Sequence, residues 1–178
     1  MKIRMNMKDE DLEIKEASEN DFNSIFEVYK NCEDFLSLGP ESKASKKMAL
    51  SDMKISKEES GIYCCIYKKE KVIGIIDFIP KGYELDSKKA YISLIMIAQS
   101  YRKKGIGRKV MAIIENEILR NPEIREILTS VQENNKIAIY FWEKLGYKII
   151  SGPEHRPDKT TVFYMQKEIE KNRETMIK

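Results

Sequence analysis

Apolar residues recur along the chain with two different spacings. In "SENDFNSIFEVYKN" (18–31) they fall three and four positions apart, which predicts a helix that begins at Ser18, and "SKKMALSDMKI" (45–55) follows the same spacing more weakly. The segments "DLEIKEAS" (11–18), "GIYCCIYKKEKVIGIIDFIP" (61–80) and "KAYISLIMIA" (89–98) are instead rich in β-branched and aromatic residues. They predict one strand before the two helices and, after them, two strands joined at "KKEK" and a third strand buried on both faces.

The second half of the chain alternates between helices and strands. "GRKVMAIIENEILR" (107–120) carries one apolar helical stripe, and "NKIAIYFWEKLG" (135–146) predicts a helix that ends at Gly146. Strands are predicted at "REILTSVQ" (125–132), "YKIIS" (147–151) and "TTVFYMQKEI" (160–169), with "SGPEHRPDK" (151–159) as the loop between the last two. Since no repeat or linker interrupts this order, we predict a single domain, residues 1–178, of mixed α/β (α+β) architecture.

The balance of charge argues against a dedicated nucleic-acid binder. Against 29 Asp and Glu there are 32 Lys and Arg, a formal net charge of +3. No apolar run reaches the roughly 18 to 20 residues of a membrane span, and the first residues lack a signal-peptide pattern, so we expect a cytoplasmic protein. Adjacent Cys64 and Cys65 point to opposite faces of a strand, Cys32 is isolated and His155 is the only histidine, a set that predicts neither a disulfide framework nor a metal site.

The segment "YRKKGIGRKV" (101–110) is a candidate anion site. It follows a predicted strand and opens a predicted helix, where backbone N–H groups lack intrahelical partners and the helix dipole is positive. Gly105 and Gly107 would let the backbone adopt positive φ and approach a ligand, and five basic residues accompany them. The spacing is neither G-x-G-x-x-G nor the P-loop motif. An ordinary strand-to-helix turn with solvated lysines would explain the same residues.

Asn135 is the second feature that asks for an explanation. On a helix of about 100° per residue it falls in one arc with six apolar residues, which are Ile137, Ala138, Ile139, Phe141, Trp142 and Leu145. A polar side chain at the start of such an arc is explained either by capping of the helix or by contact with a ligand.

These two segments together resemble the acetyl-CoA-binding half of the GNAT superfamily of N-acetyltransferases. Residues 102–107 match the family motif [RQ]-x-x-G-x-[GA], which follows its fourth strand. The family's second motif, N-x-x-A-x-x-[FL]-[YF]-x-x-x-G-F, is matched at Asn135, Ala138, Phe141 and Gly146, with Tyr147 for the final phenylalanine. The predicted element order agrees with the family over residues 11–169, which leaves 1–10 and 170–178 as terminal segments. The resemblance implies about seven strands in a mixed, largely antiparallel sheet, about four helices, and splayed fourth and fifth strands.

The resemblance also implies where acetyl-CoA, the co-substrate, would bind without a metal. The pantetheine arm would lie between the splayed strands and pair with the main chain around Met96 and Ile97, and the Ile97 N–H would polarise the thioester carbonyl. Backbone N–H groups of the segment 101–110, which we call the glycine loop, would hold the pyrophosphate. Asn135 would contact the pantetheine or phosphate end. The residues expected at coenzyme A are Met96, Ile97, Arg102, Lys103, Lys104, Gly105, Ile106, Gly107, Arg108, Asn135 and Trp142.

The catalytic groups match the family less well. An amine with a pKa of about 10.4 is almost fully protonated at neutral pH, so freeing the nucleophile costs roughly 4 to 5 kcal/mol and requires a proton acceptor. Where many relatives carry a glutamate, six residues before Ile97, this chain has Tyr91. We therefore name Asp77, reached through water, ahead of Glu84 and Asp86, although a paired or edge-facing aspartate would explain Asp77 equally. The catalytic candidates are Asp77, Tyr91 and Ile97.

The position of the family's general-acid tyrosine holds Trp142, whose indole cannot donate a proton in that way. On the acceptor side, Tyr83, Tyr91, Ser93 and the loop 153–159 are candidates, and Arg156 or Lys159 there would favour an acceptor that bears a carboxylate. His155 is a weak candidate base, because a lone loop histidine is more often exposed.

We predict an N-acetyltransferase that acts on a primary amine of a small molecule or peptide. Tyr91 and Trp142 would equally suit a non-catalytic acyl-CoA-binding sensor or interaction module. An RNA-binding domain is disfavoured by the modest net charge and the missing aromatic platform. No nucleic-acid or membrane partner is expected, and exposed strand edges or the segment 170–178 would support a homodimer.

Overall fold

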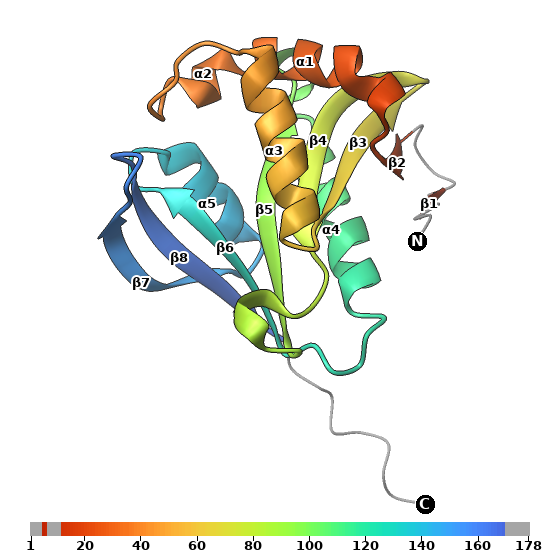
Figure 1. Ribbon diagram of the computed structural model, residues 1–178. Helices are drawn as coiled ribbons and strands as arrows, with labels where there is room; N and C mark the ends of the chain where they lie inside the picture. The colour runs from red at the N-terminus through yellow and green to blue at the C-terminus, as the bar shows by residue number, and fades with distance from the viewer. Residues whose placement is uncertain (1–4, 7–11, 170–178) are drawn as a thin grey trace, which may run out of the picture.

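The computed structural model describes residues 5–6 and 12–169, whose strands form a single sheet (Figure 1). The strand order is β1-β2-β3-β4-β5-β6-β8-β7, and every neighbouring pair is antiparallel except β5 with β6, which is parallel. The strands are β1 (Met5–Asn6), β2 (Leu12–Glu16), β3 (Ile62–Lys68), β4 (Lys71–Ile79), β5 (Lys89–Ile97), β6 (Glu126–Gln132), β7 (Lys148–His155) and β8 (Thr161–Glu168). The mixed, largely antiparallel sheet predicted for residues 11–169 is confirmed, and the two-residue β1 adds a strand that the prediction lacked.

The helices follow the predicted order with one addition. They are α1 (Phe22–Lys30), α2 (Glu33–Leu36), α3 (Lys46–Glu58), α4 (Ile106–Ile118) and α5 (Lys136–Lys144). The short α2 was not predicted, because four residues are too few to show a helical period. Ser18 opens a 3₁₀ turn, Glu19–Asp21, before α1, and its N–H and Oγ–H both donate to the Asp21 carboxylate. Among the described residues, no helix has both the length and the apolar character needed to cross a bilayer.

The helices cover the two faces of the sheet unequally (Figure 1). α4 and α5 pack on one face, around a core cluster that includes Ile76, Ile92 and Val110. On the other face α1 and α3 cover β3, β4 and part of β5. Cys64 and Cys65 belong to opposite clusters, as their adjacency on a strand predicted. β6, β8 and β7 carry no helix on the α3 side (Figure 1), and we call this side of the three strands the open face.

The two central strands, β5 and β6, separate along their length. They pair from Lys89 with Glu126 to Ile92 with Thr129, and the Thr129 Oγ–H donates to the Ile92 carbonyl at 2.9 Å. Beyond that point β5 stays paired with β4 and β6 with β8, so the two strands part. The register of β5 against β4 shifts at Ser93, where β5 carries an unpaired residue. The splayed fourth and fifth predicted strands are therefore confirmed.

Three local predictions need correction. β7 extends to His155 and pairs with β8, so much of the predicted loop 151–159 is strand. The strand 89–98 is not buried throughout, since Ser93 is exposed. Ile137 is 83% exposed and lies outside the apolar arc of its helix. The prediction for residues 170–178, a surface for dimer formation, lies outside the described residues.

Candidate active site

The loop between β5 and α4 presents a run of backbone donors. Its last amide with a backbone acceptor is Arg102, which donates to Gln99 O at 3.2 Å, and the first amide bonded in α4 is Lys109, which donates to Gly105 O at 3.1 Å. The amides of residues 103–108 have no hydrogen-bond acceptor within the described part of the chain. They sit at the positive end of the dipole of a 13-residue helix. This arrangement suits a multiply charged anion such as a diphosphate.

The two glycines of this loop have different roles. Gly105 has φ of 77°, as the glycine argument predicted, and open space where a Cβ would stand. Gly107 lies inside α4 without positive φ, and a Cβ there would approach Cε2 of Phe141 to 3.2 Å. The prediction of positive φ at Gly107 is wrong, and its missing side chain makes room for α5. Lys103 takes the left-handed conformation instead, with φ of 59°.

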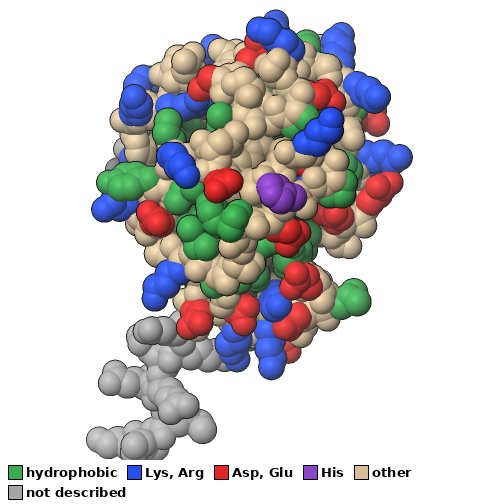
Figure 2. Space-filling view, turned by 90° about the vertical axis from the view of Figure 1, so that its left-hand side faces the viewer, with side chains coloured by type: hydrophobic (Ala, Val, Ile, Leu, Met, Phe, Trp, Pro, Cys, Tyr) green, Lys and Arg blue, Asp and Glu red, His purple; other side chains and the backbone are tan. Residues whose placement is uncertain are grey.

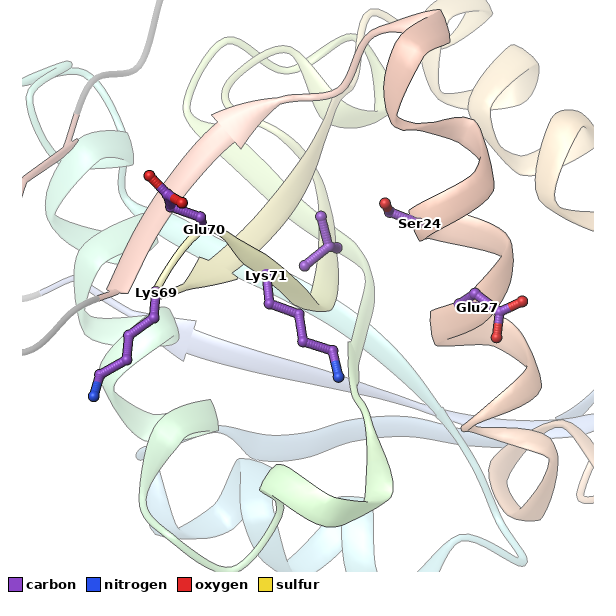
Figure 3. Close-up of a pocket in the computed structure, with 6 residues that line it drawn as sticks. Ser24, Glu27, Lys69, Glu70 and Lys71 are labelled. Carbon is purple, nitrogen blue, oxygen red and sulfur yellow. The ribbon is translucent and has the colours of Figure 1, made fainter.

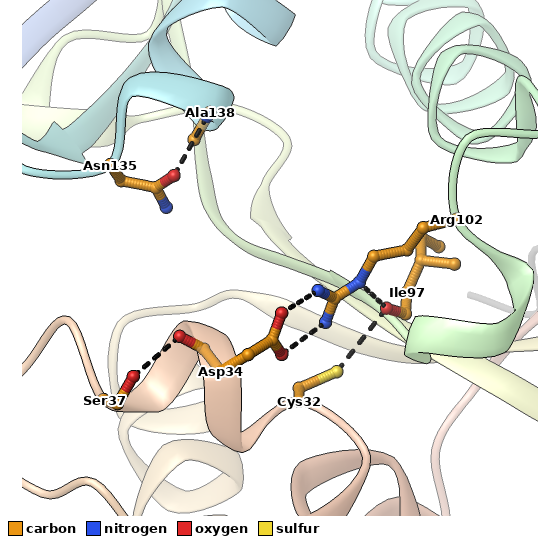
Figure 4. A network of polar contacts seen from close by, with 7 residues as sticks. All are labelled: Cys32, Asp34, Ser37, Ile97, Arg102, Asn135 and Ala138. Carbon is orange, nitrogen blue, oxygen red and sulfur yellow. Dashed lines mark hydrogen bonds and ion pairs between the residues drawn. The ribbon is translucent and has the colours of Figure 1, made fainter.

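The Arg102 side chain turns inward, away from the loop amides (Figure 4). Its Nε donates to the Ile97 carbonyl at 2.6 Å, and its guanidinium forms a two-pronged ion pair with the Asp34 carboxylate of α2. The Cys32 thiol, fully buried, donates to the same Ile97 carbonyl at 3.5 Å. Burial raises the pKa of the Cys32 thiol, which keeps it a donor. Arg102 thus ties α2 across the end of β5.

Beyond Ile92 and Thr129 a gap separates β5 from β6. The register of β5 against β4 determines which main-chain groups of β5 face this gap. Ala98 N–H donates to Ile73 O, and directly opposite residues of an antiparallel pair alternate between bonded and non-bonded. Met96 is therefore bonded to Ile75 of β4, whereas the N–H and C=O of Ile97 and Ile95 point away from β4. The Ile97 carbonyl already accepts hydrogen bonds from Arg102 and Cys32. The N–H is therefore the main-chain group of Ile97 that remains free to face the gap.

On the opposite side of the gap, Asn135 caps α5. Its Oδ1 accepts from Ala138 N–H at 3.0 Å, so the capping explanation holds, while its side-chain NH₂ has no partner among the described residues (Figure 4). Trp142, by contrast, is 4% exposed and packs edge-on against Phe141 and Tyr147. The indole fills the core, so the expectation that Trp142 contacts coenzyme A is not supported.

Tyr91 of β5 contacts β6 on the open face. Its hydroxyl is 2.8 Å from Ser130 Oγ of β6, and its ring stacks on Tyr83 with centroids 4.2 Å apart. Arg156 donates to Ser130 Oγ at 3.2 Å and to the Tyr164 hydroxyl at 3.5 Å, and no carboxylate among the described residues pairs with it. The open face therefore carries a half-buried guanidinium whose described hydrogen-bond partners are hydroxyls.

Asp77 is 6% exposed and faces α3, one strand away from the gap. Its Oδ1 accepts from the Ser56 hydroxyl at 2.6 Å. Burial raises the pKa of Asp77 to about 6, against which the Ser56 hydrogen bond acts. Of the other two carboxylates considered, Glu84 pairs with Lys89 and Asp86 accepts from Lys88 N–H, both away from the gap. The hydrogen bond from Ser56 gives Asp77 a partner, as the alternative to a catalytic role required.

The edge strand β7 carries His155, which the sequence offered as a weak candidate base. Figure 2 views the molecule from this side, with His155 at the surface and acidic and basic side chains interspersed around it. The His155 Nδ1 lies 2.8 Å from Thr161 Oγ1 of the neighbouring strand. The contact with Thr161 and the exposed position account for His155 without a catalytic role.

A hollow of about 430 Å³ lies between α1 and the turn that joins β3 to β4 (Figure 3). It is lined by Ser24, Glu27, Lys69, Glu70, Lys71 and Val72. It is a shallow surface between solvated charges on the β3 side of the sheet, and β4 and β5 separate it from the gap. Its size alone does not make it the active site.

A second pocket, of about 300 Å³, lies between α2, α3 and the end of β6, and we call it the α2–α3 pocket. Its walls are Phe35, Leu36, Gly39, Pro40, Glu41, Met48, Asp52 and Gln132. Gln132 lies three residues beyond Thr129, the last residue of β6 that pairs with β5. Asp52 and Gln132 were not predicted from the sequence. Asp52 lies four residues after Met48 and four before Ser56, on a helical stripe whose other members are apolar or small. An acidic residue in such a stripe was the sequence signal that could have identified it.

Comparisons with known proteins agree with this arrangement. A sequence model of the acetyltransferase (GNAT) family matches residues 22–147. An acetyltransferase from Thermus thermophilus superposes with a TM-score of 0.75 at 15% identity, over 89% of this chain and 97% of that one. The PaiA N-acetyltransferase from Thermoplasma acidophilum, in complex with coenzyme A, gives 0.64 at 18% identity over 89% and 99%.

A third structure is a Salmonella typhimurium acetyltransferase that modifies the N-terminal serine of a 50S ribosomal subunit protein. It superposes with a TM-score of 0.72 at 14% identity, over 89% of this chain and 95% of that one. No curated protein sequence gives a significant match. The family match spans both the glycine loop and the Asn135 helix, and the chain belongs to the acetyltransferase (GNAT) family.

Proposed function

We propose that the protein transfers the acetyl group of acetyl-CoA directly to a primary amine of a small molecule or peptide. One observation carries the proposal: the unbonded amides of residues 103–108 stand at the mouth of the gap between β5 and β6. Amides and helix dipole suit a diphosphate, and the parted strands offer an edge to an extended pantetheine arm. A structural neighbour that binds coenzyme A supports the same reading.

In this reaction the amine nitrogen attacks the thioester carbon, a C–N bond forms and the C–S bond breaks. An ammonium ion sheds two protons in becoming an amide; one ends on the coenzyme A thiol and the other is released. The Ile97 N–H, directed into the gap, would stabilise the oxyanion of the tetrahedral intermediate. No side chain of general-acid type is required for this, because a thiol of pKa about 8.5 leaves tolerably as thiolate.

The proposal is tested by thiol release from acetyl-CoA in the presence of a broad amine panel. We expect release that depends on both the amine and the protein, with mass spectrometry showing an acetyl group on the amine. Binding of acetyl-CoA without thiol release for any amine or peptide would support the acyl-CoA sensor instead. Absence of both binding and release would contradict the proposal altogether.

A further inference from the structure

The α2–α3 pocket is built to attract positive charge. Two carboxylates line it, Glu41 and Asp52, and no Lys, Arg or His does. Neither carboxylate forms an ion pair with any residue that the structure describes. Burial raises the pKa of Asp52, a hydrogen bond from Tyr29 opposes that increase, and the nearby Glu41 charge adds to it. Two carboxylates in one pocket with no counterion are stabilised by a bound cation.

Two side-chain acceptor atoms of the residues that line the pocket have no described donor. Asp52 Oδ2 accepts from the Tyr29 hydroxyl at 2.5 Å, and that hydroxyl is 3.0 Å from the Tyr63 hydroxyl, so the carboxylate is held in place. Its Oδ1 has no partner within the described residues. Gln132 Oε1 is buried and likewise has no partner there. Leaving a buried acceptor without a donor is unfavourable, so the site favours a ligand rich in N–H groups.

The rest of the pocket is apolar and small. Phe35 and Leu36 of α2 and Met48 of α3 supply carbon surface beside the acceptors. A volume of about 300 Å³ is at the lower end of the range of small-molecule sites. These walls suit a short alkyl chain attached to an ammonium group.

We propose that the α2–α3 pocket binds the acceptor as a small aliphatic ammonium ion without a carboxylate. Asp52 Oδ1 and Gln132 Oε1 accept its N–H groups, and Glu41 adds attraction. The alkyl chain lies against Phe35, Leu36 and Met48. This inference rests on the proposed function and names its substrate class. It opposes the sequence-based expectation of a carboxylate-bearing acceptor at Arg156, which lies on the open face and does not line the α2–α3 pocket.

A matched pair of amines separates the two classes. 1,5-Diaminopentane and lysine carry the same amino groups and differ by one carboxylate. Their binding is measured by calorimetry on the protein saturated with coenzyme A that lacks an acetyl group, so no transfer occurs. We expect the diamine to bind at least about tenfold more tightly than lysine, a difference of about 1.4 kcal/mol. Transfer rates from acetyl-CoA should show the same preference in KM.

Two variants and a control assign the preference to the pocket. Asp52→Asn keeps an oxygen for the Tyr29 hydroxyl and removes the charge, and it should reduce the preference for the diamine to about threefold or less. Gln132→Met removes the unpaired acceptor and should weaken diamine binding. Glu123→Gln removes an exposed charge between α4 and β6 and should alter neither amine's affinity. Thermal unfolding of each variant checks that it is folded.

The inference is overturned if lysine binds as tightly as the diamine, if no carboxylate-free alkylamine binds, or if Asp52→Asn keeps the full preference. Preference for lysine that is lost in Arg156→Gln would instead assign the acceptor to Arg156. Failure of the proposed function is distinct, because the wild-type protein would then bind no coenzyme A and release no thiol with any amine.

Discussion

Arg102 and Asp34 join the end of β5 to α2 through a two-pronged ion pair between residues 68 positions apart in the chain. The Arg102 guanidinium holds the pKa of Asp34 below its usual range. The same Arg102 side chain also donates a hydrogen bond to the Ile97 carbonyl. A single residue thus connects α2, the end of β5 and the start of the loop between β5 and α4. Phe35 and Leu36 on α2 are thereby held against the α2–α3 pocket.

Removing this tie should loosen α2 more than the rest of the protein. Asp34→Ala is expected to lower the free energy of unfolding by only about 1 kcal/mol, because the pair is half exposed. Amide hydrogen exchange should nevertheless accelerate in residues 32–38 and not in β3 or β4. Glu27→Ala, which removes an exposed pair with Lys30 on α1, is the control and should leave α2 exchange unchanged. Unaltered exchange at α2 in Asp34→Ala would contradict the role given to the pair.

Two substitutions of Asn135 separate capping from ligand contact. Asn135→Ala removes the cap and should lower the free energy of unfolding by about 1 kcal/mol. Asn135→Asp keeps an oxygen for Ala138 N–H and should unfold like the wild type. It also replaces the unpartnered NH₂ with an anionic oxygen, so its Kd for acetyl-CoA should rise about tenfold. Wild-type affinity in Asn135→Asp would show that the residue is a cap alone.

Trp142 stands where a catalytic tyrosine would be expected, yet it is a core residue. Trp142→Tyr should therefore not raise kcat in the thiol-release assay. It should lower the free energy of unfolding by about 1 to 3 kcal/mol, because a smaller ring leaves space and its hydroxyl is buried. A rise in kcat with unchanged stability would mean that position 142 does reach the reacting atoms.

The buried Asp77 predicts a dependence of stability on pH. Its folded pKa, about 6, lies above its ordinary value of 3.8, so between these values the folded state holds a proton that the unfolded state has released. Stability contributed by Asp77 therefore falls as pH rises through this window. Relative to Asp77→Asn, the wild type should lose about 1 to 3 kcal/mol between pH 4 and pH 7 in urea titrations. A constant difference across that range would contradict the assignment.

The elements and their order were predictable because their residues repeat with clear periods. Val110, Ile113, Ile114 and Ile118 are all buried on α4, as their spacing required. The failures have physical causes. α2 is too short for a period, and Ile137 lies at the exposed first turn of its helix. β7 continues through Gly152 and Pro153, residues that ordinarily mark a loop, because pairing with β8 is maintained around them.

The site was predictable only where it is local in sequence. Gly105 and the amides that follow it lie in one continuous segment, so a motif could find them. The α2–α3 pocket draws Asp52 from a helix and Gln132 from a strand end 80 positions later. Only the packing of α3 beside the end of β6 brings these two together, and no spacing within the chain reports it. Arg102 was expected at the anion for its backbone N–H and its charge, whereas its N–H donates to Gln99 O and its guanidinium pairs with Asp34 of α2.

Calorimetric titration of acetyl-CoA into two glycine variants tests whether the amides that follow Gly105 hold the diphosphate. Gly105 and Gly82 both have positive φ, 77° and 82°, and both have open space where a Cβ would stand. Valine at either position therefore introduces similar backbone strain. The amides after Gly105 hold the diphosphate in our account, so Gly105→Val should weaken binding more than about tenfold, while Gly82→Val should bind like the wild type. Equal affinity in all three proteins, or no binding by the wild type, would contradict it.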